Sequence, residues 1–304
     1  MESACSFVLA LLLAPLFPGI ILKVKALFAG KQGPPLLIKY WTLTKLLRKG
    51  VVYSTTTSFV FRLGPLLACA TSLTALLFFP LAGLPPLIAF HGDVIVLFYL
   101  FGLGRFFTIA AALDTGSPFE GMGAAREALF GTLAEAAIFA VLMLFFRLKG
   151  SLSLAGYFAA AQPIAITGPQ GALLILVVVA LFMLLLAENS RVPVDDPATH
   201  LELTMIHEVM ILDHSGPDLA LIEYGAFTKL FFYTALVASL LKPTTISGPI
   251  ANTLVFYGLL TLVYVAIGIT ESVTARLKMN MVPKYILTSF ALVFFALILT
   301  LEIT

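Results

Sequence analysis

The chain has 304 residues, of which 60% are hydrophobic and 11% are charged, and its formal net charge is +2. Because soluble proteins carry about 25% charged residues, this composition excludes an ordinary soluble domain and predicts an integral membrane protein. We treat residues 1–304 as a single membrane domain. No nucleic-acid partner is expected, because the basic residues lie beside apolar stretches.

Eight apolar stretches are candidates for membrane-spanning helices, each of which needs roughly 20 apolar residues. The first begins after Glu2, where a signal peptide would carry basic residues, so we predict a span that stays in the protein. The sequence therefore predicts an all-α polytopic membrane protein with eight transmembrane helices, at residues 6–22, 63–82, 93–113, 129–146, 171–187, 224–241, 251–270 and 285–301.

The distribution of Lys and Arg predicts the orientation of these spans. Loops 23–50, 114–128, 188–223 and 271–284 carry twelve Lys or Arg, whereas the loops at the opposite ends carry three. By the positive-inside rule the first set is cytoplasmic. Both termini are then expected on the non-cytoplasmic side.

The first cytoplasmic loop, 23–50, contains seven basic residues and no acid. Its segment 36–47 mixes apolar and aromatic residues with lysines, which is typical of an amphipathic helix lying in the membrane interface. Two interpretations stay open. The bases bind lipid phosphates as an anchor, or they dock a cytoplasmic partner; the residues in question are Lys31, Lys39, Lys45 and Arg48.

Charges also lie inside the third and fourth spans. Arg105 is near the middle of the third, which is costly unless an acid or a wet cavity receives it. Pairing with Glu135 or with Asp114 is plausible, as a structural ion pair or as part of a transport route. Glu135 lies six residues into the fourth span and is a functional candidate. Residues 114–127 hold three glycines and a proline, so we predict an irregular loop between these spans.

Two further features receive no role. The outer segment 148–170 is moderately apolar and predicts either a surface loop or a short re-entrant turn. Cys5 and Cys69 lie in or beside apolar spans without metal-ligand spacing, and we interpret them as packing residues.

The acidic loop 188–223 is the candidate functional site. It holds eight of the sixteen acids, three of the four histidines and a single base, Arg191. Charged side chains near hydrocarbon are found chiefly where they line a water-filled cavity, relay protons or contact a partner protein. Pro193 ends the fifth span, and Asp196 followed by Pro197 predicts a short helix over 197–212. Lys229 then lies a turn or two inside span six.

The three histidines of this loop recur every seven residues, at positions 200, 207 and 214. Two turns of helix separate the first two by about 10 Å, too far to share one ion. His207 and Glu208 do not form a zinc-protease motif, because position 211 is isoleucine. We therefore expect surface or hydrogen-bonded histidines, and no metal or haem in this chain.

Several motifs of the chain occur together in one known family. The run from Glu188 to Pro197, with Glu202 and Leu203 downstream, resembles the segment E-x-x-R-x-P-F-D-x-P-E-A-E-x-E-L of the respiratory complex I subunit 1 family. The similarity is closest to the membrane subunit of formate hydrogenlyase and other group 4 membrane-bound nickel-iron hydrogenases. Matching motifs elsewhere are Gly33-Pro34, Phe61-Arg62-Leu63 with Pro65, Arg105-Phe106-Phe107, Leu113 to Phe119, Gly123-Ala124 with Arg126-Glu127, Glu135, Ser215-Gly216 and Glu223-Tyr224.

The resemblance implies a subunit of the cell inner (plasma) membrane that joins a peripheral redox arm to antiporter-like membrane subunits. The arm would consist of a nickel-iron hydrogenase-like large subunit and an iron-sulfur small subunit, which would hold the metal centres. This chain would be a non-catalytic subunit without a cofactor of its own. The chain departs from the family's segment at three positions: Val194 replaces a phenylalanine, and Ala198 and His200 replace glutamates. The loss of these carboxylates favours a role like that of the hydrogenase-type relatives over quinone binding.

These observations lead to one hypothesis and several alternatives. The hypothesis is a hydrated acidic proton path whose members are Glu135, Glu188, Asp195, Glu202, Glu223 and Lys229, tuned by Arg105, Arg126 and Arg191 and flanked by docking residues that include Asp213 and His214. The alternatives are a passive anchoring module and a quinone-site subunit, the latter with a lipophilic tunnel between the first-loop helix and spans one and six. A stand-alone transporter is disfavoured because no internal repeat is evident.

Overall fold

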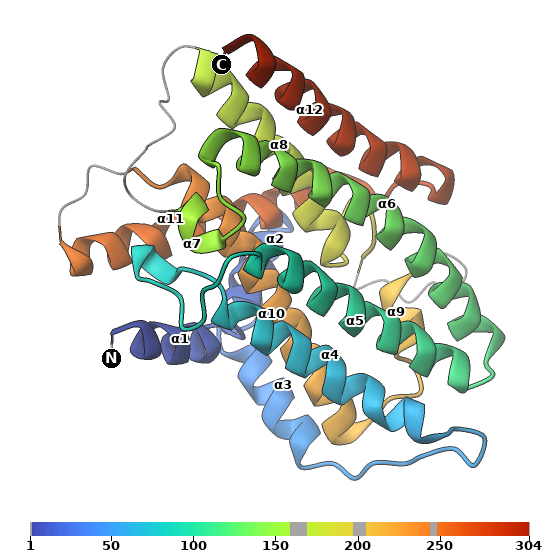
Figure 1. The fold of residues 1–304 in the computed structure, drawn as a ribbon. Coiled ribbons are helices and arrows are strands. Elements are labelled where there is room, and N and C mark those ends of the chain that lie inside the picture. Colours follow the sequence, from blue (N-terminus) through green and yellow to red (C-terminus); the bar gives the residue numbers. More distant parts are fainter. Residues whose placement is uncertain (1, 159–168, 197–204, 244–247, 304) are drawn as a thin grey trace.

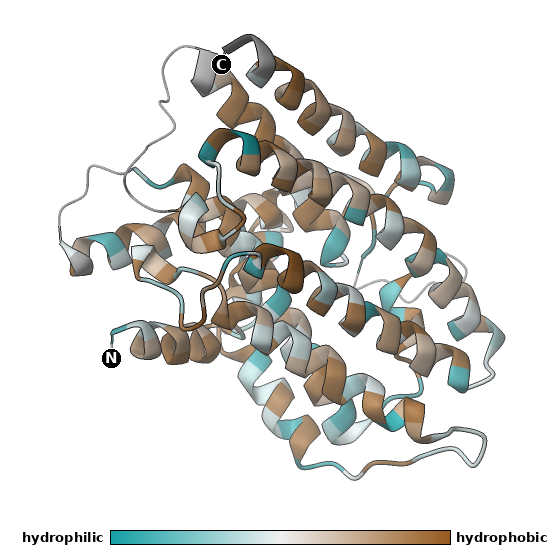
Figure 2. Cartoon of the chain, in the orientation of Figure 1, coloured by the Kyte–Doolittle hydropathy of each residue, from teal (hydrophilic) through white to brown (hydrophobic). Residues whose placement is uncertain are grey.

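The computed structural model describes residues 2–158, 169–196, 205–243 and 248–303, and these residues form helices and connecting segments without a strand. Within them, seven helices are long and apolar enough to cross a membrane, and a bent pair at the start of the chain makes an eighth. The predicted all-α fold with eight spans is confirmed. Hydrophobic residues cover most of these helices (Figure 2).

The first predicted span is broken into α1 (Glu2–Leu13) and α2 (Phe17–Phe28), which meet at an angle of 41°. Proline explains the break. Pro15 has no N–H to give to the Leu11 carbonyl one turn earlier, and Pro18 likewise cannot bond to Ala14. The tyrosine hydroxyls of two other helices donate to the carbonyls left at this break, Tyr224 to Leu11 at 3.1 Å and Tyr40 to Leu12.

The amphipathic helix predicted in the first loop is present as α3 (Ile38–Leu47). Trp41 and Leu47 are exposed on it, whereas Leu46 is buried. The helix packs against α10 (Gly216–Leu241), where the Lys39 ammonium lies 5.3 Å from the ring centroid of Phe227. Two bases of this loop, Lys39 and Lys45, are thus carried on a helix at the edge of the bundle (Figure 1).

Small residues let the central helices approach closely. α4 (Phe59–Leu77) packs against α5 (Asp93–Asp114) and α10. A Cβ added to Gly64 would lie 2.7 Å from that of Ala111, and one added to Gly225 would lie 3.0 Å from the Cys69 backbone. Such small-residue contacts are typical of helix pairs in membranes.

The irregular loop predicted over 114–128 is wrong for most of its length. α6 spans Pro118–Lys149, so only residues 115–117 connect it to α5. Proline suits the first turn of a helix, where its missing N–H is not needed. A Cβ on Gly123 would collide with Val209, and one on Gly131 would lie 2.6 Å from the Arg105 guanidinium. The glycines that suggested a loop are instead positions of close packing within a helix.

The remaining helices complete the bundle. α8 (Pro169–Glu188) and α12 (Val282–Ile303) pack side by side and against α6, while α11 (Pro249–Val273) packs against α2 and α10. Short elements lie in the connections: η1 (Leu81–Gly83), α7 (Leu154–Tyr157), α9 (His207–Met210) and η2 (Met279–Met281).

The connections meet at two opposite ends of the bundle. At one end Leu277 donates to Pro193, Asp213 donates to Glu120, and a Cβ added to Gly216 would lie 2.6 Å from the Gly50 carbonyl oxygen, so the four loops predicted to be cytoplasmic lie together. At the other end Asp93 accepts hydrogen bonds from Ser153 and Leu154, and Lys242 lies against the Ala82 carbonyl. The loops are therefore segregated in the way that the charge distribution predicted.

Candidate functional site

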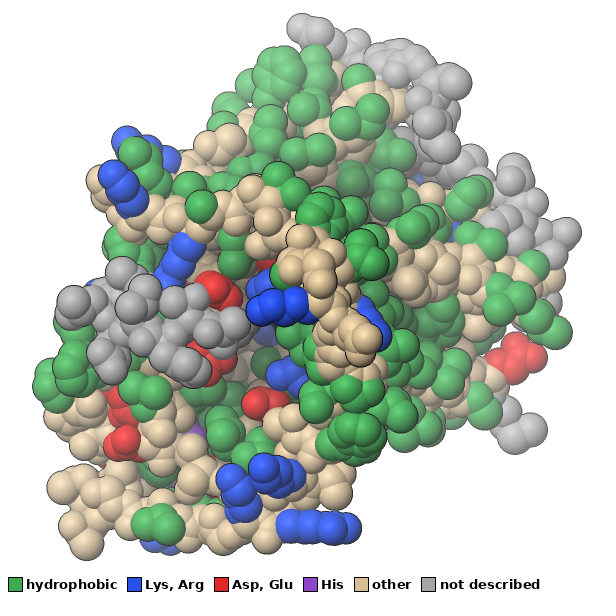
Figure 3. All heavy atoms as spheres, turned by 180° about the vertical axis from the view of Figure 1, so that it is seen from behind, with side chains coloured by type: hydrophobic (Ala, Val, Ile, Leu, Met, Phe, Trp, Pro, Cys, Tyr) green, Lys and Arg blue, Asp and Glu red, His purple; other side chains and the backbone are tan. Residues whose placement is uncertain are grey.

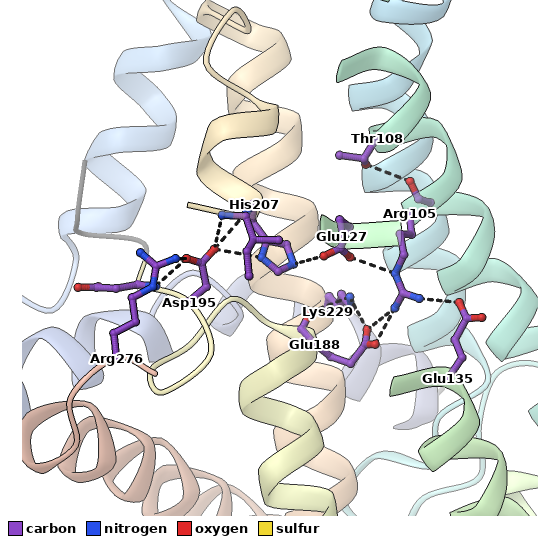
Figure 4. A network of polar contacts seen from close by, with 12 residues as sticks. Arg105, Thr108, Glu127, Glu135, Glu188, Asp195, His207, Lys229 and Arg276 are labelled. Atoms are coloured by element: carbon purple, nitrogen blue, oxygen red, sulfur yellow. Dashed lines mark hydrogen bonds and ion pairs between the residues drawn. The ribbon is translucent and has the colours of Figure 1, made fainter. Parts of the chain in front are cut away.

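Arg105 lies at the centre of a buried charged network, with 10% of its side chain exposed (Figure 4). Arg105 is on α5, and its guanidinium lies 2.6 Å from Glu135 Oε1, 2.6 Å from Glu188 Oε1 and 3.1 Å from Glu127 Oε1. Of the two partners predicted for Arg105, Glu135 is confirmed and Asp114 is wrong. Asp114 instead accepts the backbone N–H groups of Ser58 and Phe61, at the start of α4.

Glu188, the last residue of α8, also receives a second cation. The Lys229 ammonium of α10 lies 2.9 Å from Glu188 Oε2 and 2.8 Å from its carbonyl oxygen. Only 2% of the Glu188 side chain is exposed, so two cations neutralise one carboxylate that is almost fully removed from water. This pairing joins α5, α8 and α10 at the depth where the fifth span ends.

The network continues through His207 to the acidic loop. His207 Nε2 lies 3.0 Å from Glu127 Oε2, and its Nδ1 lies 3.3 Å from Asp195 Oδ2. Arg276, which follows α11, donates to Asp195 Oδ1 at 2.7 Å. A chain of contacts thus runs from Glu135 on α6, through Arg105 and Glu127, to Asp195 beyond the end of α8 (Figure 4).

Charge is balanced in this network when His207 is protonated. Four carboxylates, those of Glu127, Glu135, Glu188 and Asp195, face the basic side chains of Arg105, Lys229 and Arg276. A protonated His207 supplies the fourth positive charge. Burial opposes charge on the imidazole, but Glu127 and the hydrogen bond to Asp195 outweigh it and raise the pKa of His207 to about 10.

Asp195 orders the loop that follows α8. Its Oδ2 accepts the backbone N–H groups of Ile206 at 3.3 Å and His207 at 3.0 Å, and only 1% of its side chain is exposed. Burial acts against the charged form, yet the His207 contacts and the Arg276 charge hold the pKa of Asp195 below its usual range. Asp195 therefore serves as an ionised anchor for the start of α9.

The helix predicted over 197–212 is wrong at its described end. Met205 and Ile206 are not helical, and α9 covers only His207–Met210 before a turn returns the chain to α10. Asp195, which precedes the expected cap at Asp196, bonds to N–H groups eleven and twelve residues later instead of the next turn. Residues 197–204, including Glu202 and His200, lie outside the described residues.

A cavity of about 360 Å³ opens beside this network. Its apolar wall includes Pro18 and Leu22 of α2, Ala68 of α4 and Phe227 of α10. Figure 3 shows acidic and basic side chains gathered around a hollow on the face opposite to that of Figure 1. Charged residues that line the cavity are Lys25, Lys39, Arg105, Glu127, Glu188, Arg191, His207, Glu208, Glu223, Lys229 and Glu271.

Two acids of the predicted site region line this cavity and repel one another. Glu223 lies about two turns into α10, and Glu208 is on α9. Burial, together with the negative charges of Glu223 and Asp195, raises the pKa of Glu208 above its usual range. Glu208 is therefore a carboxylate of this loop that takes up a proton more readily than an exposed glutamate would.

A second group of ion pairs holds the other side of the cavity. Glu271 of α11 lies 3.0 Å from the Lys25 ammonium of α2 and 3.4 Å from the Arg191 guanidinium, with 1% of its side chain exposed. The predicted tuning residue Arg191 thus contacts Glu271 and not the central network. Arg126, also predicted to tune the path, donates to the Met205 carbonyl at 2.8 Å and so contacts the acidic loop.

The predicted docking residues divide by exposure. Lys31, Lys45, Arg48 and Asp213 are exposed at the loop end of the bundle, and Lys39 lines the cavity. His214 is buried with its ring stacked on Phe61 at a centroid distance of 3.9 Å. Burial lowers the pKa of His214 to about 4. His214 therefore does not belong to the exposed docking surface with which we grouped it.

Sequence reasoning missed four members of these clusters: Glu127, His207, Glu271 and Arg276. Glu127 precedes Glu135 by eight residues, a little over two turns, which places both on one helix face. That signal was hidden because 114–128 was interpreted as a loop. No local pattern marks His207 or Arg276, since their partners are distant in sequence.

Comparison with known proteins agrees with this architecture. The family model described as NADH dehydrogenase matches residues 2–301. Hydrogenase-4 component C of Escherichia coli (strain K12) is 30% identical over 236 residues, covering 78% of this chain and 73% of that protein. Formate hydrogenlyase subunit 4 of the same organism is 26% identical over 291 residues, covering 94% and 93%.

A solved structure shares the fold. The chain resembles one from the structure of the membrane-bound sulfane sulfur reductase (MBS), an archaeal respiratory membrane complex, with a TM-score of 0.82 and 19% identity. The match covers 98% of both chains, so the arrangement of helices is common to the two proteins over nearly their whole length.

Proposed function

The chain belongs to the NADH dehydrogenase family, and we propose that it is the membrane-anchoring and coupling subunit of a multi-subunit, redox-driven ion pump. Its relatives carry the names of hydrogenase-4 and formate hydrogenlyase components. In the proposal its partners are a nickel-iron hydrogenase-like large subunit, an iron-sulfur small subunit and antiporter-like membrane subunits. The metal centres belong to those partners.

The observation that carries the proposal is the continuous charged network between the cavity and α6. Glu188 faces the cavity, and Arg105 joins it to Glu135, whose side chain is 36% exposed on α6. Carboxylates this deep in an apolar bundle are expensive to bury and are retained mainly for function. We propose that Glu223 and Glu188 receive protons on the cavity side, that Asp195 belongs to the path through its contact with His207, and that Glu135 passes protons on within the bundle.

The same proposal assigns the remaining residues. Lys229, Arg105, Arg126 and Arg191 set the affinity of the neighbouring carboxylates for protons, and Glu202 remains a proposed member of the path that lies outside the described residues. The loop end of the bundle faces the cytoplasm of a cell whose inner (plasma) membrane holds the complex. There the exposed Lys31, Lys45, Arg48 and Asp213 dock the peripheral arm or, for the bases, bind lipid phosphates.

Replacement of Glu135 or Glu188 by Gln tests the path. Gln keeps the size and polarity of the side chain but carries no proton between water and the bundle. We expect E135Q and E188Q to abolish proton movement coupled to electron transfer while the complex still assembles. The measurement is proton uptake into inside-out vesicles per electron pair transferred, with subunit content followed on native gels.

The matched control is E2Q, because Glu2 is an exposed carboxylate outside the network and should leave proton uptake unchanged. Normal coupled proton movement in both E135Q and E188Q would remove the path from this chain and leave the passive anchoring role. If E188Q fails to assemble because Arg105 and Lys229 lose a carboxylate partner, E135Q still decides, since Glu135 is the most exposed acid of the network.

A quinone site is the second candidate function, and the cavity is the observation that favours it. It is lined by residues of α2, α3 and α10, the elements between which a lipophilic tunnel was predicted. Ala226 of α10 lines the cavity and is exposed, so A226W would narrow it without disturbing the core. If the purified complex reduces quinone and A226W loses this activity, the quinone site is supported. If the unmodified complex does not reduce quinone, the quinone site is rejected.

A further inference from the structure

His207 contacts a buried carboxylate with each of its ring nitrogens. Nε2 lies 3.0 Å from Glu127 Oε2 and Nδ1 lies 3.3 Å from Asp195 Oδ2 (Figure 4). A neutral imidazole has one N–H donor and one lone pair, so one of the two carboxylates would face a lone pair. An imidazolium donates to both. With both carboxylates ionised, the geometry therefore fits the protonated ring and does not fit either neutral tautomer.

The three residues of this contact come from separate elements. Glu127 is on α6, Asp195 is in the loop after α8, and His207 begins α9. α9 also packs directly on α6, since a Cβ on Gly123 would collide with Val209. The histidine ring thus lies where Asp195 and α9 meet α6.

We propose that His207 is a positioning residue of the proton path, which as an imidazolium clamps α9 and the loop after α8 against α6. The clamp holds Glu127 and Asp195 in one network with Arg105. The part of this inference that concerns proton movement depends on the proposed function, whereas the clamp is a property of the fold and is measured separately.

Charged groups from every neighbouring element contribute to the field at the ring. Glu127 and Asp195 contact the ring directly, Arg105 and Arg276 act one contact further away through those carboxylates, and the remaining groups line the same cavity as the ring. The groups are Glu127 of α6, Asp195 of the loop after α8, Glu208 of α9, Glu223 and Lys229 of α10, Arg105 of α5, and Arg276 after α11.

The sign of the pH effect follows from the raised pKa. We call the state in which His207 contacts Glu127 and Asp195 the closed state. Because the pKa of His207 rises from 6.5 to about 10 in this state, its protonation stabilises the closed state fully below about pH 6.5. That stabilisation declines as the pH rises and is lost above about pH 10. Between the two pKa values, each rise of one pH unit increases the equilibrium constant for opening by about tenfold.

Hydrogen exchange in the assembled complex tests the clamp. The amides of Ile206 and His207, which donate to Asp195, report on opening of the loop. After correction for intrinsic exchange, their protection in the unmodified protein should fall by at least about tenfold between pH 6.5 and 10. H207Q should show low protection at all pH values, and H207R, which keeps the charge, should show protection that does not depend on pH.

H91Q is the matched control, because His91 is an exposed histidine in the segment before α5 at the opposite end of the bundle. It should keep the unmodified pH profile. Constant protection of the unmodified protein between pH 6.5 and 10 would overturn the clamp, and this measurement needs no variant to fold. A normal profile in H207Q would overturn it equally.

Proton movement distinguishes positioning from direct transfer. As a positioning residue, His207 should be replaceable by Arg, so H207R should restore coupled proton uptake that H207Q loses. Restored loop protection without restored uptake would overturn the positioning role. If E135Q pumps normally and the amide protection of the unmodified protein still falls with pH, the proposed path is wrong and the clamp is supported. If E135Q does not pump and the protection stays constant with pH, the path is supported and the clamp is wrong.

Discussion

At the scale of single residues, Arg105 shows why an arginine occupies the centre of the network. A guanidinium presents five N–H donors in a plane, so it can contact carboxylates on several sides, whereas an ammonium acts as a point charge. Glu127, Glu135 and Glu188 approach it from two helices. Gly131 leaves the space that the guanidinium occupies against α6.

Replacement of Arg105 by Met should destabilise the protein strongly. Removal of one partner of a buried ion pair leaves an uncompensated charge and costs about 3–5 kcal/mol. We expect R105M to lower the free energy of unfolding in detergent by that amount, and R105K to recover part of it. K31M is the control, because Lys31 is exposed. Equal stability of R105M and the unmodified protein would show that the carboxylates are neutral without Arg105.

The sequence predicted about half of this network, for a physical reason. Arg105, Glu135 and Glu188 could be recognised because a charge within or at the end of an apolar span is conspicuous. His207, Glu127 and Arg276 could not, because their environment depends on how α6, α9 and the loops pack. Of the two environments expected for the histidines, surface or hydrogen-bonded, His207 has the second, and its membership of the central network could not be predicted.

At the scale of elements, the tyrosines at the break between α1 and α2 replace a hydrogen bond that the helix cannot make. Pro15 leaves the Leu11 carbonyl without its usual N–H donor, and the hydroxyl of Tyr224 fills that place at 3.1 Å. A break of this kind inside a membrane is tolerated when neighbouring helices satisfy the freed backbone groups.

Replacement of Tyr224 by Phe tests this account of the break. Y224F removes only the hydroxyl and leaves a half-buried carbonyl without this donor, and an unpaired group removed from water costs about 1–3 kcal/mol. We expect a lower midpoint of thermal unfolding. Y99F is a matched control, since Tyr99 is 72% exposed. An unchanged midpoint in Y224F would mean that the Leu11 carbonyl finds another donor.

α6 shows where local propensity misleads. Gly, Ser and Pro between 116 and 123 favour a loop by their intrinsic preferences. In the folded chain, Gly123 and Gly131 are required for contact with α9 and with Arg105, and packing outweighs their low helix propensity. The third and fifth spans, by contrast, were predicted at 93–113 and 171–187 and are present as Asp93–Asp114 and Pro169–Glu188.

At the scale of the whole molecule, the loops lie at two opposite ends of the bundle, and this segregation fits either orientation in the membrane. Contacts such as Leu277 to Pro193 and Val52 to Ser215 bring the base-rich and acid-rich loops to one end. The positive-inside rule assigns that end to the cytoplasm.

Labelling with a membrane-impermeant maleimide tests the orientation. Cys5 is exposed near the start of α1 and Lys31 is exposed at the opposite end, whereas Cys69 is buried. Cys5 should react in right-side-out vesicles, and K31C in a C5S background should react only in inside-out vesicles. The reverse pattern would invert the proposed topology and place the acidic loop outside the cell.

The bond between Tyr224 and Leu11 also bears on how the chain is made. Leu11 enters the membrane early in synthesis, but its donor is 213 residues further along the chain. Until α10 has been inserted, the N-terminal bend keeps a carbonyl that lipid cannot satisfy. The N-terminal bend therefore acquires its final hydrogen bonds only when the sixth crossing is in place, so a chain truncated before α10 should be recognised by quality-control proteases as incompletely folded.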